Sequence, residues 1–310
     1  MKLKLHIAET EDFSQEVLTD MGNVFDLSTG SVDNIKSTLN EVDIFWFRLG
    51  YQIDKNVLDE NSRCKILATP VTGIDHIDEK LCHKLGIKII CLRGEKEFLR
   101  EVRATAEHSI LLAMMLMRKA AAAVFHTQNT NWKRDLFRGH EIYKKNIGIL
   151  GLGRLGKIVA EYYQVFGCQI FFYDTSKVEY PETWNMCNSA EEVIDNADIV
   201  SIHIPYNEHT DRIYGNKFFQ HFTNQKWLVN TARGGVIDEQ YMLRALKENR
   251  IAGAALDVLQ GEPNNINEEL INFSRENDNL ILTPHIGGNT YESFEKTEKF
   301  IAQKIKEAIA

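Results

Sequence analysis

The fold of this chain is decided by the stretch Asn146-Ile-Gly-Ile-Leu-Gly-Leu-Gly-Arg-Leu-Gly156. Residues 147–150 are apolar and predict a buried strand, and a helix-like pattern follows at once. Between them Gly151, Gly153 and Gly156 have the spacing G-x-G-x-x-G. In that spacing the first glycine permits a tight turn, the second lets the backbone approach a pyrophosphate, and the third lets helix and strand pack closely.

A second predicted strand, residues 169–173, ends in Asp174. An acid about 20 residues beyond the glycines holds a ribose hydroxyl in dinucleotide sites, and the N-terminus of the helix attracts phosphates. These four parts together predict that NAD binds here, with a glycine-rich turn that binds nothing as the alternative. Asp174 would repel the 2′-phosphate of NADP, although nearby Lys177 could soften that preference.

Composition excludes several other classes of protein. A chain of 310 residues is long enough for one or two domains. Its net charge of −8 is spread along the sequence without a basic block, which argues against nucleic acid as a partner. The longest apolar candidate, residues 110–117, is too short to cross a membrane. Five scattered cysteines predict no disulfide framework and no metal site, so we expect a cytoplasmic protein.

Short apolar runs alternate with amphipathic segments in the first part of the chain, which predicts a parallel α/β sheet. The expected strands are residues 3–7, 42–47, 65–68 and 87–91, with a helix over 78–85. A strong helix is predicted over 105–118, and the run 120–124 is expected to extend it. Residues 132–145 are polar, aromatic and irregular, and they predict an arm or linker.

A second sheet is predicted from six apolar runs separated by helical patterns: residues 147–150, 170–173, 199–204, 227–230, 254–258 and 280–282. Such alternation is typical of the doubly wound Rossmann fold. The tail, residues 290–310, has the pattern of an amphipathic helix, and we expect it to cross back to the first domain. The prediction is therefore an α/β protein in which a Rossmann NAD domain, residues 98–287, is inserted in a flavodoxin-like substrate domain, residues 1–97 and 288–310.

Polar residues that could carry chemistry follow three successive predicted strands. Arg233 comes after residues 227–230, Glu262 after 254–258, and His285 after 280–282. Ligands bind at the carboxyl ends of parallel strands. A histidine held by a carboxylate suits proton exchange near neutral pH, and an arginine can bind a carboxylate bidentately. With a nicotinamide, these groups would form a hydride-transfer site for 2-oxo acids, whereas taken singly each could be structural.

The sequence resembles the D-isomer-specific 2-hydroxyacid dehydrogenase family over nearly its whole length. The resemblance rests on Gly73-Ile-Asp-His-Ile-Asp78, Thr105-Ala-Glu-His108 with Arg118, the Gly151 motif, Ser201-Ile-His-Ile-Pro205, Asn230-Thr-Ala-Arg-Gly-Gly235, Ala255-Leu-Asp-Val258 with Glu262-Pro263, and Thr283-Pro-His-Ile-Gly-Gly288.

This resemblance implies a catalytic trio. His285 would exchange the proton, Glu262 would hold His285 in its working tautomer, and Arg233 would bind the substrate carboxylate and carbonyl. Backbone N–H groups at Thr72 and Gly73 would bind the same carboxylate. The implied active site lies in a cleft between two domains that closes by hinge motion, and the implied homodimer packs through residues 105–145.

The resemblance also implies the residues of the NAD site. Arg154 and Leu155 would offer backbone to the pyrophosphate, and Asp174 would take the ribose. Asp257 and the Ala232 carbonyl would orient the nicotinamide carboxamide. The remaining predicted cofactor residues are Thr105, Gly151, Gly153, Gly156, Pro205 and Gly288.

Within the family, the chain is most similar to phosphoglycerate dehydrogenases that lack a C-terminal regulatory domain, so D-3-phosphoglycerate is the predicted substrate. Arg48 matches an arginine that those enzymes use near the substrate phosphate, although it could be a plain strand-end arginine. Glu101 stands where they have an asparagine, and an acid there would oppose a phosphate unless Arg100 or Arg103 turned inward. Glyoxylate, hydroxypyruvate, lactate or a larger oxo acid therefore stays open.

Three further alternatives remain. Formate dehydrogenases share the fold but carry glutamine where Glu262 stands. A corepressor that senses NAD(H), similar to the C-terminal-binding proteins, would share the fold and the trio but bind peptides. A third alternative is a degenerate binding protein without turnover.

Overall fold

The computed structural model describes residues 2–310 and divides into two units. One unit comprises the residues up to Val102 together with Asn289–Ala310, and the other is Arg103–Gly288. The chain leaves the first unit, builds the second and returns, which confirms the predicted insertion. The first boundary follows Val102 instead of residue 97, because Phe98 stacks on Phe300 at 4.0 Å between ring centroids and Leu99 is buried in the first core.

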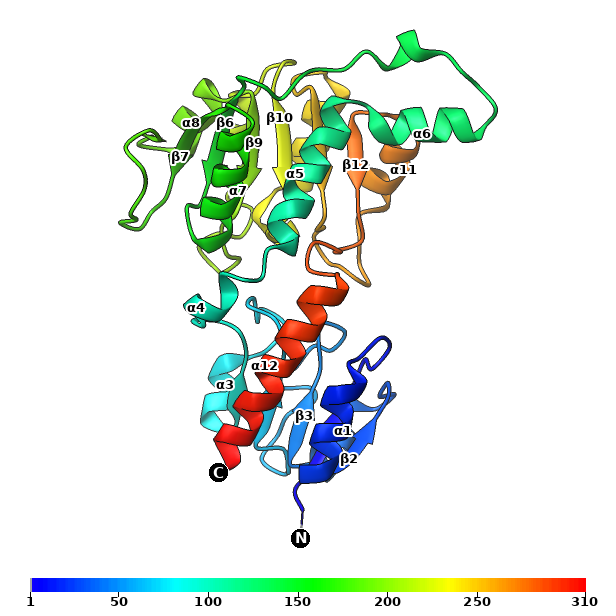
Figure 1. Cartoon of the computed structure of the whole chain (residues 1–310), viewed down its shortest axis with the longest axis vertical. Helices are drawn as coiled ribbons and strands as arrows, with labels where there is room; N and C mark the ends of the chain where they lie inside the picture. The colour runs from blue at the N-terminus through cyan, green and yellow to red at the C-terminus, as the bar shows by residue number, and fades with distance from the viewer. Residues whose placement is uncertain (1) are drawn as a thin grey trace. The chain divides into compact units, whose positions relative to one another are not determined.

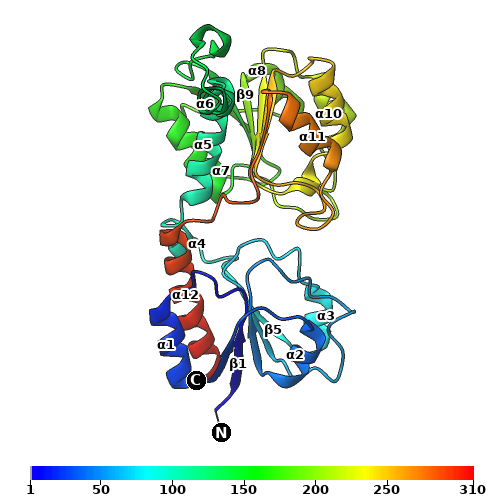
Figure 2. The same ribbon diagram turned by 90° about the vertical axis from the view of Figure 1, so that its right-hand side faces the viewer.

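The first unit is a five-stranded parallel sheet with the order β2-β1-β3-β4-β5, the flavodoxin-like order that was predicted. Its strands are β1 Lys4–Ile7, β2 Asp26–Thr29, β3 Ile44–Trp46, β4 Ile66–Ala68 and β5 Lys88–Ile90. Its helices are α1 Gln15–Val24, α2 Ile35–Glu41, α3 Glu79–Lys84, α4 Lys96–Leu99 and α12 Tyr291–Ile309. Figure 2 shows α1 and α12 on one side of the sheet and α2 and α3 on the other.

Alternation along the strands explains these two layers. In β3, Ile44 and Trp46 join the core beneath α1 and α12, whereas Phe45 joins the core beneath α2 and α3. Successive side chains of a strand point to opposite faces, so a strand that is apolar throughout buries both. Strand β2 was missed from the sequence because its residues, Asp26-Leu-Ser-Thr29, are mostly polar and lie at an exposed edge of the sheet.

The second unit is a seven-stranded parallel sheet with the order β12-β11-β10-β9-β6-β7-β8. Its strands are β6 Asn146–Leu150, β7 Gln169–Tyr173, β8 Asn185–Met186, β9 Ile199–Ile202, β10 Trp227–Asn230, β11 Gly253–Leu256 and β12 Leu280–Leu282. The order reverses beside β6, which is the doubly wound arrangement of a Rossmann domain. The short edge strand β8 adds a seventh strand to the six that were predicted.

Helices cover both faces of this sheet, with α5, α6 and α7 on one side and α10 and α11 on the other (Figure 2). The helices are α5 Ala104–Met117, α6 Ala120–Gln128, α7 Arg154–Val165, α8 Ala190–Asn196, α9 Asn216–Gln220, α10 Glu239–Lys247 and α11 Glu268–Glu276. Two short 3₁₀ helices are η1 Arg134–Phe137 and η2 Gly234–Val236.

The expected extension of α5 through residues 120–124 was wrong. Lys119 has a φ of +50°, in the left-handed region, so the chain turns there and α6 is a separate helix (Figure 1). Glycine is the residue that usually marks a left-handed backbone conformation, and position 119 holds a lysine, so the sequence did not indicate a turn here. Residues 129–145 hold only η1 as regular structure, in line with the irregular arm that was predicted.

Two findings concern the chain as a whole. Within residues 2–310, no single helix is both long and apolar enough to cross a membrane, and only the bent pair Lys96–Met117 and Ala120–Gln128 reaches that length and composition when its helices are combined. All five cysteines are free, and four of them are buried.

Candidate active site

The three predicted catalytic residues all belong to the second unit and follow three neighbouring strands. Strands β10, β11 and β12 are adjacent and parallel, so their carboxyl ends lie at one edge of the sheet. Arg233 follows β10, Glu262 follows β11, and His285 follows β12. Topology therefore gathers side chains that are far apart in the sequence.

His285 and Glu262 form a direct pair. Nδ1 of His285 lies 2.7 Å from Oε1 of Glu262, so the imidazole donates its Nδ1 proton to the carboxylate. The other carboxylate oxygen, Oε2, accepts from the backbone N–H of Leu259 at 3.1 Å. The side chains of His285 and Glu262 are 30% and 24% exposed. The pair thus keeps the Nε2 side of the imidazole for a substrate, as a proton-transferring histidine requires.

The backbone of His285 is held in an unusual conformation. Its φ is +54°, a region that residues other than glycine seldom adopt. The carboxylate of Asp257 accepts from the backbone N–H groups of Ile286 at 2.9 Å and Gly287 at 2.7 Å, and the Asp257 carbonyl accepts from the N–H of His285 at 2.8 Å. These bonds fix the turn that presents the imidazole.

Asp257 is only 1% exposed and also accepts a 2.6 Å hydrogen bond from the Thr283 hydroxyl, while Nε2 of His108 lies 3.2 Å away. Burial acts to raise the pKa of Asp257, but the hydrogen bonds from His108, Thr283 and the backbone outweigh it and hold the pKa below the usual value. The sequence placed Asp257 inside a strand, whereas it lies one residue beyond β11. The hydrogen bonds by which Asp257 holds the turn at His285 were not predicted from the sequence. Its role in orienting the nicotinamide carboxamide stays a prediction.

Arg233 lies at the start of η2, where Asn230 holds the turn. The buried Asn230 side chain accepts from the N–H of Ala232 at 3.0 Å and donates to the carbonyl of Arg233 at 2.9 Å. Nη1 of Arg233 donates to the Ala232 carbonyl at 2.9 Å, the carbonyl predicted to meet the carboxamide. Sequence reasoning missed this role of Asn230, although a buried amide at a strand end is a signal for it.

The glycine loop fits a dinucleotide. Gly151 has a φ of +91°, and a Cβ on Gly156 would lie 2.1 Å from the Gly151 carbonyl oxygen, so both positions require glycine. A Cβ on Gly153, the N-cap of α7, would meet no other atom of residues 2–310 within 4 Å. The N-terminus of a 12-residue helix therefore faces open space, which is what a pyrophosphate needs.

Other predicted cofactor residues surround this loop within the second unit. Asp174 directly follows β7 and accepts from the backbone N–H groups of Leu152 at 2.8 Å and Ser176 at 2.7 Å. Arg154 begins α7, and burial lowers its pKa. Within residues 2–310, the buried Thr231 hydroxyl lacks a hydrogen-bond partner, which leaves it for a ligand beside Ala232. These observations fit NAD.

The remaining predicted contacts are less distinctive. Leu155 is part of the core beneath α5 and α7. The Pro205 carbonyl accepts from the Thr210 hydroxyl at 2.8 Å. Thr105, in α5, lies next to the segment after His285, since a Cβ on Gly288 would be 3.9 Å from Thr105 Oγ1. These contacts do not by themselves assign Leu155, Pro205 or Thr105 to the cofactor site, so their roles in binding NAD stay predictions.

Arg48, in the first unit, is engaged by other residues. Its Nη2 lies 2.6 Å from Oε1 of Glu298, and its guanidinium lies 4.0 Å from the Phe294 ring centroid and 5.6 Å from that of Phe13. Glu298 is 1% exposed, and burial raises its pKa although hydrogen bonds from Ser14 and Arg48 oppose the rise. This pairing weighs against the prediction that Arg48 binds a phosphate.

Thr72 and Gly73, whose backbone N–H groups were predicted to bind the substrate carboxylate, lie in the loop after β4 of the first unit and are partly exposed.

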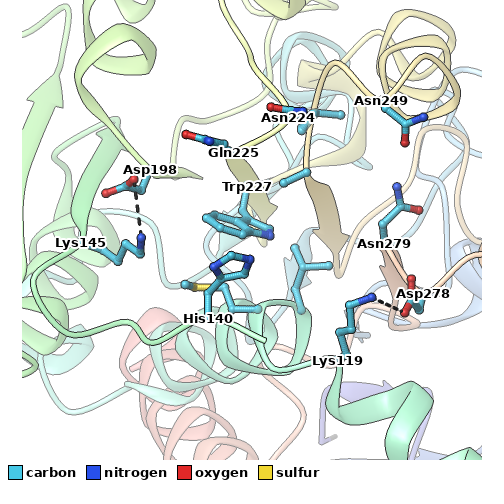
Figure 3. A pocket seen from close by; sticks show the side chains of 14 residues that line it. Lys119, His140, Lys145, Asp198, Asn224, Gln225, Trp227, Asn249, Asp278 and Asn279 are labelled. Atoms are coloured by element: carbon cyan, nitrogen blue, oxygen red, sulfur yellow. Dashed lines mark hydrogen bonds and ion pairs between the residues drawn. The ribbon is translucent and has the colours of Figure 1, made fainter. Parts of the chain in front are cut away.

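A pocket of about 640 Å³ in the second unit is lined by residues other than the trio. Figure 3 shows the side chains that line it. It lies at the amino ends of β10, β11 and β12, where Trp227, Ala252 and Asn279 line it. Its two lysines are paired, Lys119 with Asp278 and Lys145 with Asp198. Across residues 2–310, no group of three or more metal-ligating side chains is arranged to hold a metal ion.

Comparison with known proteins gives the family. Residues 110–287, more than half of the chain, match the family model described as D-isomer specific 2-hydroxyacid dehydrogenase, NAD binding domain. A glyoxylate reductase from Thermococcus gammatolerans is 32% identical over 278 residues, 86% of this chain and 80% of that protein. A D-3-phosphoglycerate dehydrogenase from Methanocaldococcus jannaschii is 28% identical over 298 residues, 95% of this chain and 55% of that protein. The chain thus spans about half the length of the phosphoglycerate dehydrogenases it matches.

Solved structures agree with this match. An acyclic imino acid reductase in complex with NADPH and D-Arg has a TM-score of 0.85 at 26% identity, covering 99% of this chain and 97% of that one. D-Lactate dehydrogenase from Aquifex aeolicus, complexed with NAD and lactic acid, has a TM-score of 0.84 at 24% identity, with 98% and 95% covered, and supports the fold alone. By its sequence and its fold, this chain belongs to the D-isomer-specific 2-hydroxyacid dehydrogenase family, and the unit Arg103–Gly288 carries the family's NAD-binding domain.

Proposed function

We propose that the protein is an NAD-dependent D-2-hydroxyacid dehydrogenase, which transfers a hydride between nicotinamide and a 2-hydroxy or 2-oxo acid. The observation that carries the proposal is the 2.7 Å pair of His285 and Glu262, which follow β12 and β11, with Arg233 following the adjacent strand β10. Family membership and a glycine loop that fits a dinucleotide support it.

Each residue of the trio has a distinct task in this proposal. NAD supplies the hydride acceptor when it is bound. In the oxidation direction, Nε2 of His285 takes the hydroxyl proton, and Glu262 stabilises the imidazolium through the proton on Nδ1. Arg233 binds the substrate carboxylate with its planar guanidinium. Backbone N–H groups at Thr72 and Gly73 are proposed to assist in holding that carboxylate.

The geometry favours an unphosphorylated substrate. The sequence-based preference for D-3-phosphoglycerate rested on Arg48, whose charge is neutralised by the buried Glu298. Glu101, which would oppose a phosphate, is exposed in the same unit. We therefore place a small 2-oxo acid such as glyoxylate or hydroxypyruvate ahead of the phosphorylated substrate, and relatives of both kinds match this chain.

NADH oxidation against a panel of substrates tests the proposal. The panel is glyoxylate, hydroxypyruvate, pyruvate, 2-oxoglutarate and bulkier 2-oxo acids, together with 3-phosphoglycerate and NAD in reverse. Turnover of an unphosphorylated acid supports the proposal, and a clear preference for 3-phosphoglycerate would return Arg48 to the phosphate site. Silence across the panel with NADH still bound would instead support a sensor of NAD(H).

We also propose that the protein is a cytoplasmic homodimer. The free cysteines suit a reducing compartment. Large apolar side chains of α6 and the arm are exposed, with Phe125 at 69%, Trp132 at 87% and Leu136 at 59%, as expected of an interface. Sedimentation velocity of Trp132→Glu tests the dimer, with Tyr291→Glu as a control because Tyr291 is 85% exposed outside the arm. We expect Trp132→Glu to sediment as a monomer and Tyr291→Glu to stay a dimer. If both variants stayed dimers, the proposed interface through the arm would be contradicted.

A further inference from the structure

The loop that carries Glu262 runs from the end of β11 to the start of α11. It bends sharply at Gly261, whose φ is +79°, and the N–H of Asn265 donates to the Gly261 carbonyl at 2.8 Å. A Cβ on Gly261 would lie 2.3 Å from the Asn265 carbonyl oxygen. A loop of this kind needs anchors at both ends if it is to present one carboxylate oxygen to His285 at a fixed distance.

One buried side chain supplies anchors at both ends. Glu239, the first residue of α10, is 5% exposed. Its Oε1 accepts from the backbone N–H of Gln260 at 2.6 Å, two residues before Glu262, and its carboxylate also accepts from the side chain of Asn267. Asn267 is the N-cap of α11, where its Oδ1 accepts from the N–H of Glu269 at 3.1 Å. Glu239 therefore joins the beginning and the end of the loop.

The surroundings make this contact close. A Cβ on Gly234 would lie 2.0 Å from the carbonyl carbon of Leu259, so η2, which precedes α10, rests directly on the loop backbone. Burial raises the pKa of Glu239, and the negative charges of Glu262 and Asp238 act in the same direction, against the hydrogen bonds from Gln260 and Asn267. A buried carboxylate costs free energy unless it is hydrogen-bonded, so the bonds to Gln260 and Asn267 are what stabilise Glu239 in this place.

We propose that Glu239 is a positioning residue, which acts through Gln260 and Asn267 to hold Glu262 within hydrogen-bond reach of Nδ1 of His285. The inference rests on the proposed function, because it assigns Glu239 to the same proton-transfer pair. Glu239 does not exchange protons with the substrate in this account. Its effect on turnover passes through Glu262 alone.

Three variants separate the anchors. Glu239→Ala removes both, and Glu239→Gln keeps an acceptor for Gln260 but faces the Asn267 amide with a second donor. Asn267→Ser keeps an N-cap for α11 and removes only the anchor at the loop end. Glu268→Gln is the matched control, since Glu268 is an exposed glutamate beside the same loop.

The kinetic test is a split between kcat and KM together with a double-mutant cycle. Glu239→Ala should lower kcat by about 10- to 100-fold while the Kd for NADH is unchanged, with Glu239→Gln and Asn267→Ser intermediate. In a Glu262→Gln background, Glu239→Ala should have no further effect on kcat. Equal effects of Glu239→Ala in both backgrounds, or kcat unchanged in all three variants, would overturn the proposal.

A second readout needs no turnover. In protein labelled with ¹⁵N-histidine, the Nδ1–H resonance of His285, identified by its loss in His285→Gln, should shift or disappear in Glu239→Ala and persist in Glu268→Gln. An unchanged resonance in Glu239→Ala, Glu239→Gln and Asn267→Ser would contradict the positioning role. Because this signal reports the His285–Glu262 bond directly, it stays informative if no substrate of the panel is turned over, which would be a failure of the proposed function only.

Discussion

The guanidinium of Arg48 lies 2.6 Å from the carboxylate of Glu298, and this pair joins the segment after β3 to α12 within the first unit. Removing one partner of a buried pair leaves an uncompensated charge, so Arg48→Gln should lower the free energy of unfolding by about 3 kcal/mol. Urea denaturation measures the change. Arg63→Gln is the control, because Arg63 is 45% exposed in its pair with Asp43 and should change stability by less than about 1 kcal/mol. If Arg48→Gln had the stability of the wild type and a raised KM for a phosphorylated substrate, Arg48 would be a substrate-binding residue and this account of the pair would be wrong.

Asp174 should set the choice between NADH and NADPH. Asp174→Asn keeps an acceptor for only one of the two backbone N–H groups, of Leu152 and Ser176, that the Asp174 carboxylate binds, and it removes the charge that opposes a 2′-phosphate. We expect KM for NADH to rise and KM for NADPH to rise less or to fall, in steady-state assays with one oxo acid. Asp174→Ala should raise KM for NADH more than that for NADPH. Equal changes for the two cofactors would remove Asp174 from cofactor choice.

Asp257 should both hold the backbone turn at His285 and contribute to the stability of the fold. In Asp257→Asn, the amide nitrogen of the new side chain would face the N–H of Ile286 or Gly287, leaving a buried donor unpaired at a cost of about 2 kcal/mol. The turn at His285 should then relax, so kcat should fall together with the midpoint of thermal unfolding. Asp278→Asn, at an exposed ion pair in the same unit, should change neither. The prediction fails if Asp257→Asn behaves like that control.

His203 should make the fold sensitive to mild acid. Burial lowers the pKa of His203 to about 4 from 6.5, and its Nε2 lies 2.8 Å from the Ser201 hydroxyl. Because the unfolded chain takes up the proton near pH 6.5 and the folded chain only near pH 4, the free energy of unfolding should fall as pH drops through that window, by about 2 kcal/mol between pH 7.5 and 5.0. Urea titrations of His203→Gln should show that much less dependence on pH, and identical losses in both proteins would contradict it.

The sequence was sufficient wherever local pattern decides structure. The glycine spacing after residues 147–150, the acid at Asp174 and the alternation of apolar runs predicted the Rossmann unit, and strand-end positions predicted the trio. The insertion of one unit in the other followed from the amphipathic tail. These features depend on neighbours in the sequence, or on the rule that ligands bind at the carboxyl ends of parallel strands.

Features that depend on distant contacts were not predictable in this way. Arg48 and Glu298 stand 250 residues apart, and only the folded first unit brings them together. The left-handed turn at Lys119 and the polar edge strand β2 carry no local signal of their conformation. In the same way, Glu239 reads as an ordinary acid at the start of a helix until its contacts with Gln260 and Asn267 are seen.

The central claim is that His285, held by Glu262, moves the substrate proton. The most direct measurement is the single-turnover rate of NADH oxidation by His285→Gln with the best oxo acid of the panel, beside NADH binding followed by fluorescence. The account predicts a rate lower by about 100-fold or more with the Kd for NADH unchanged. A rate equal to that of the wild type would contradict the account and remove His285 from the mechanism.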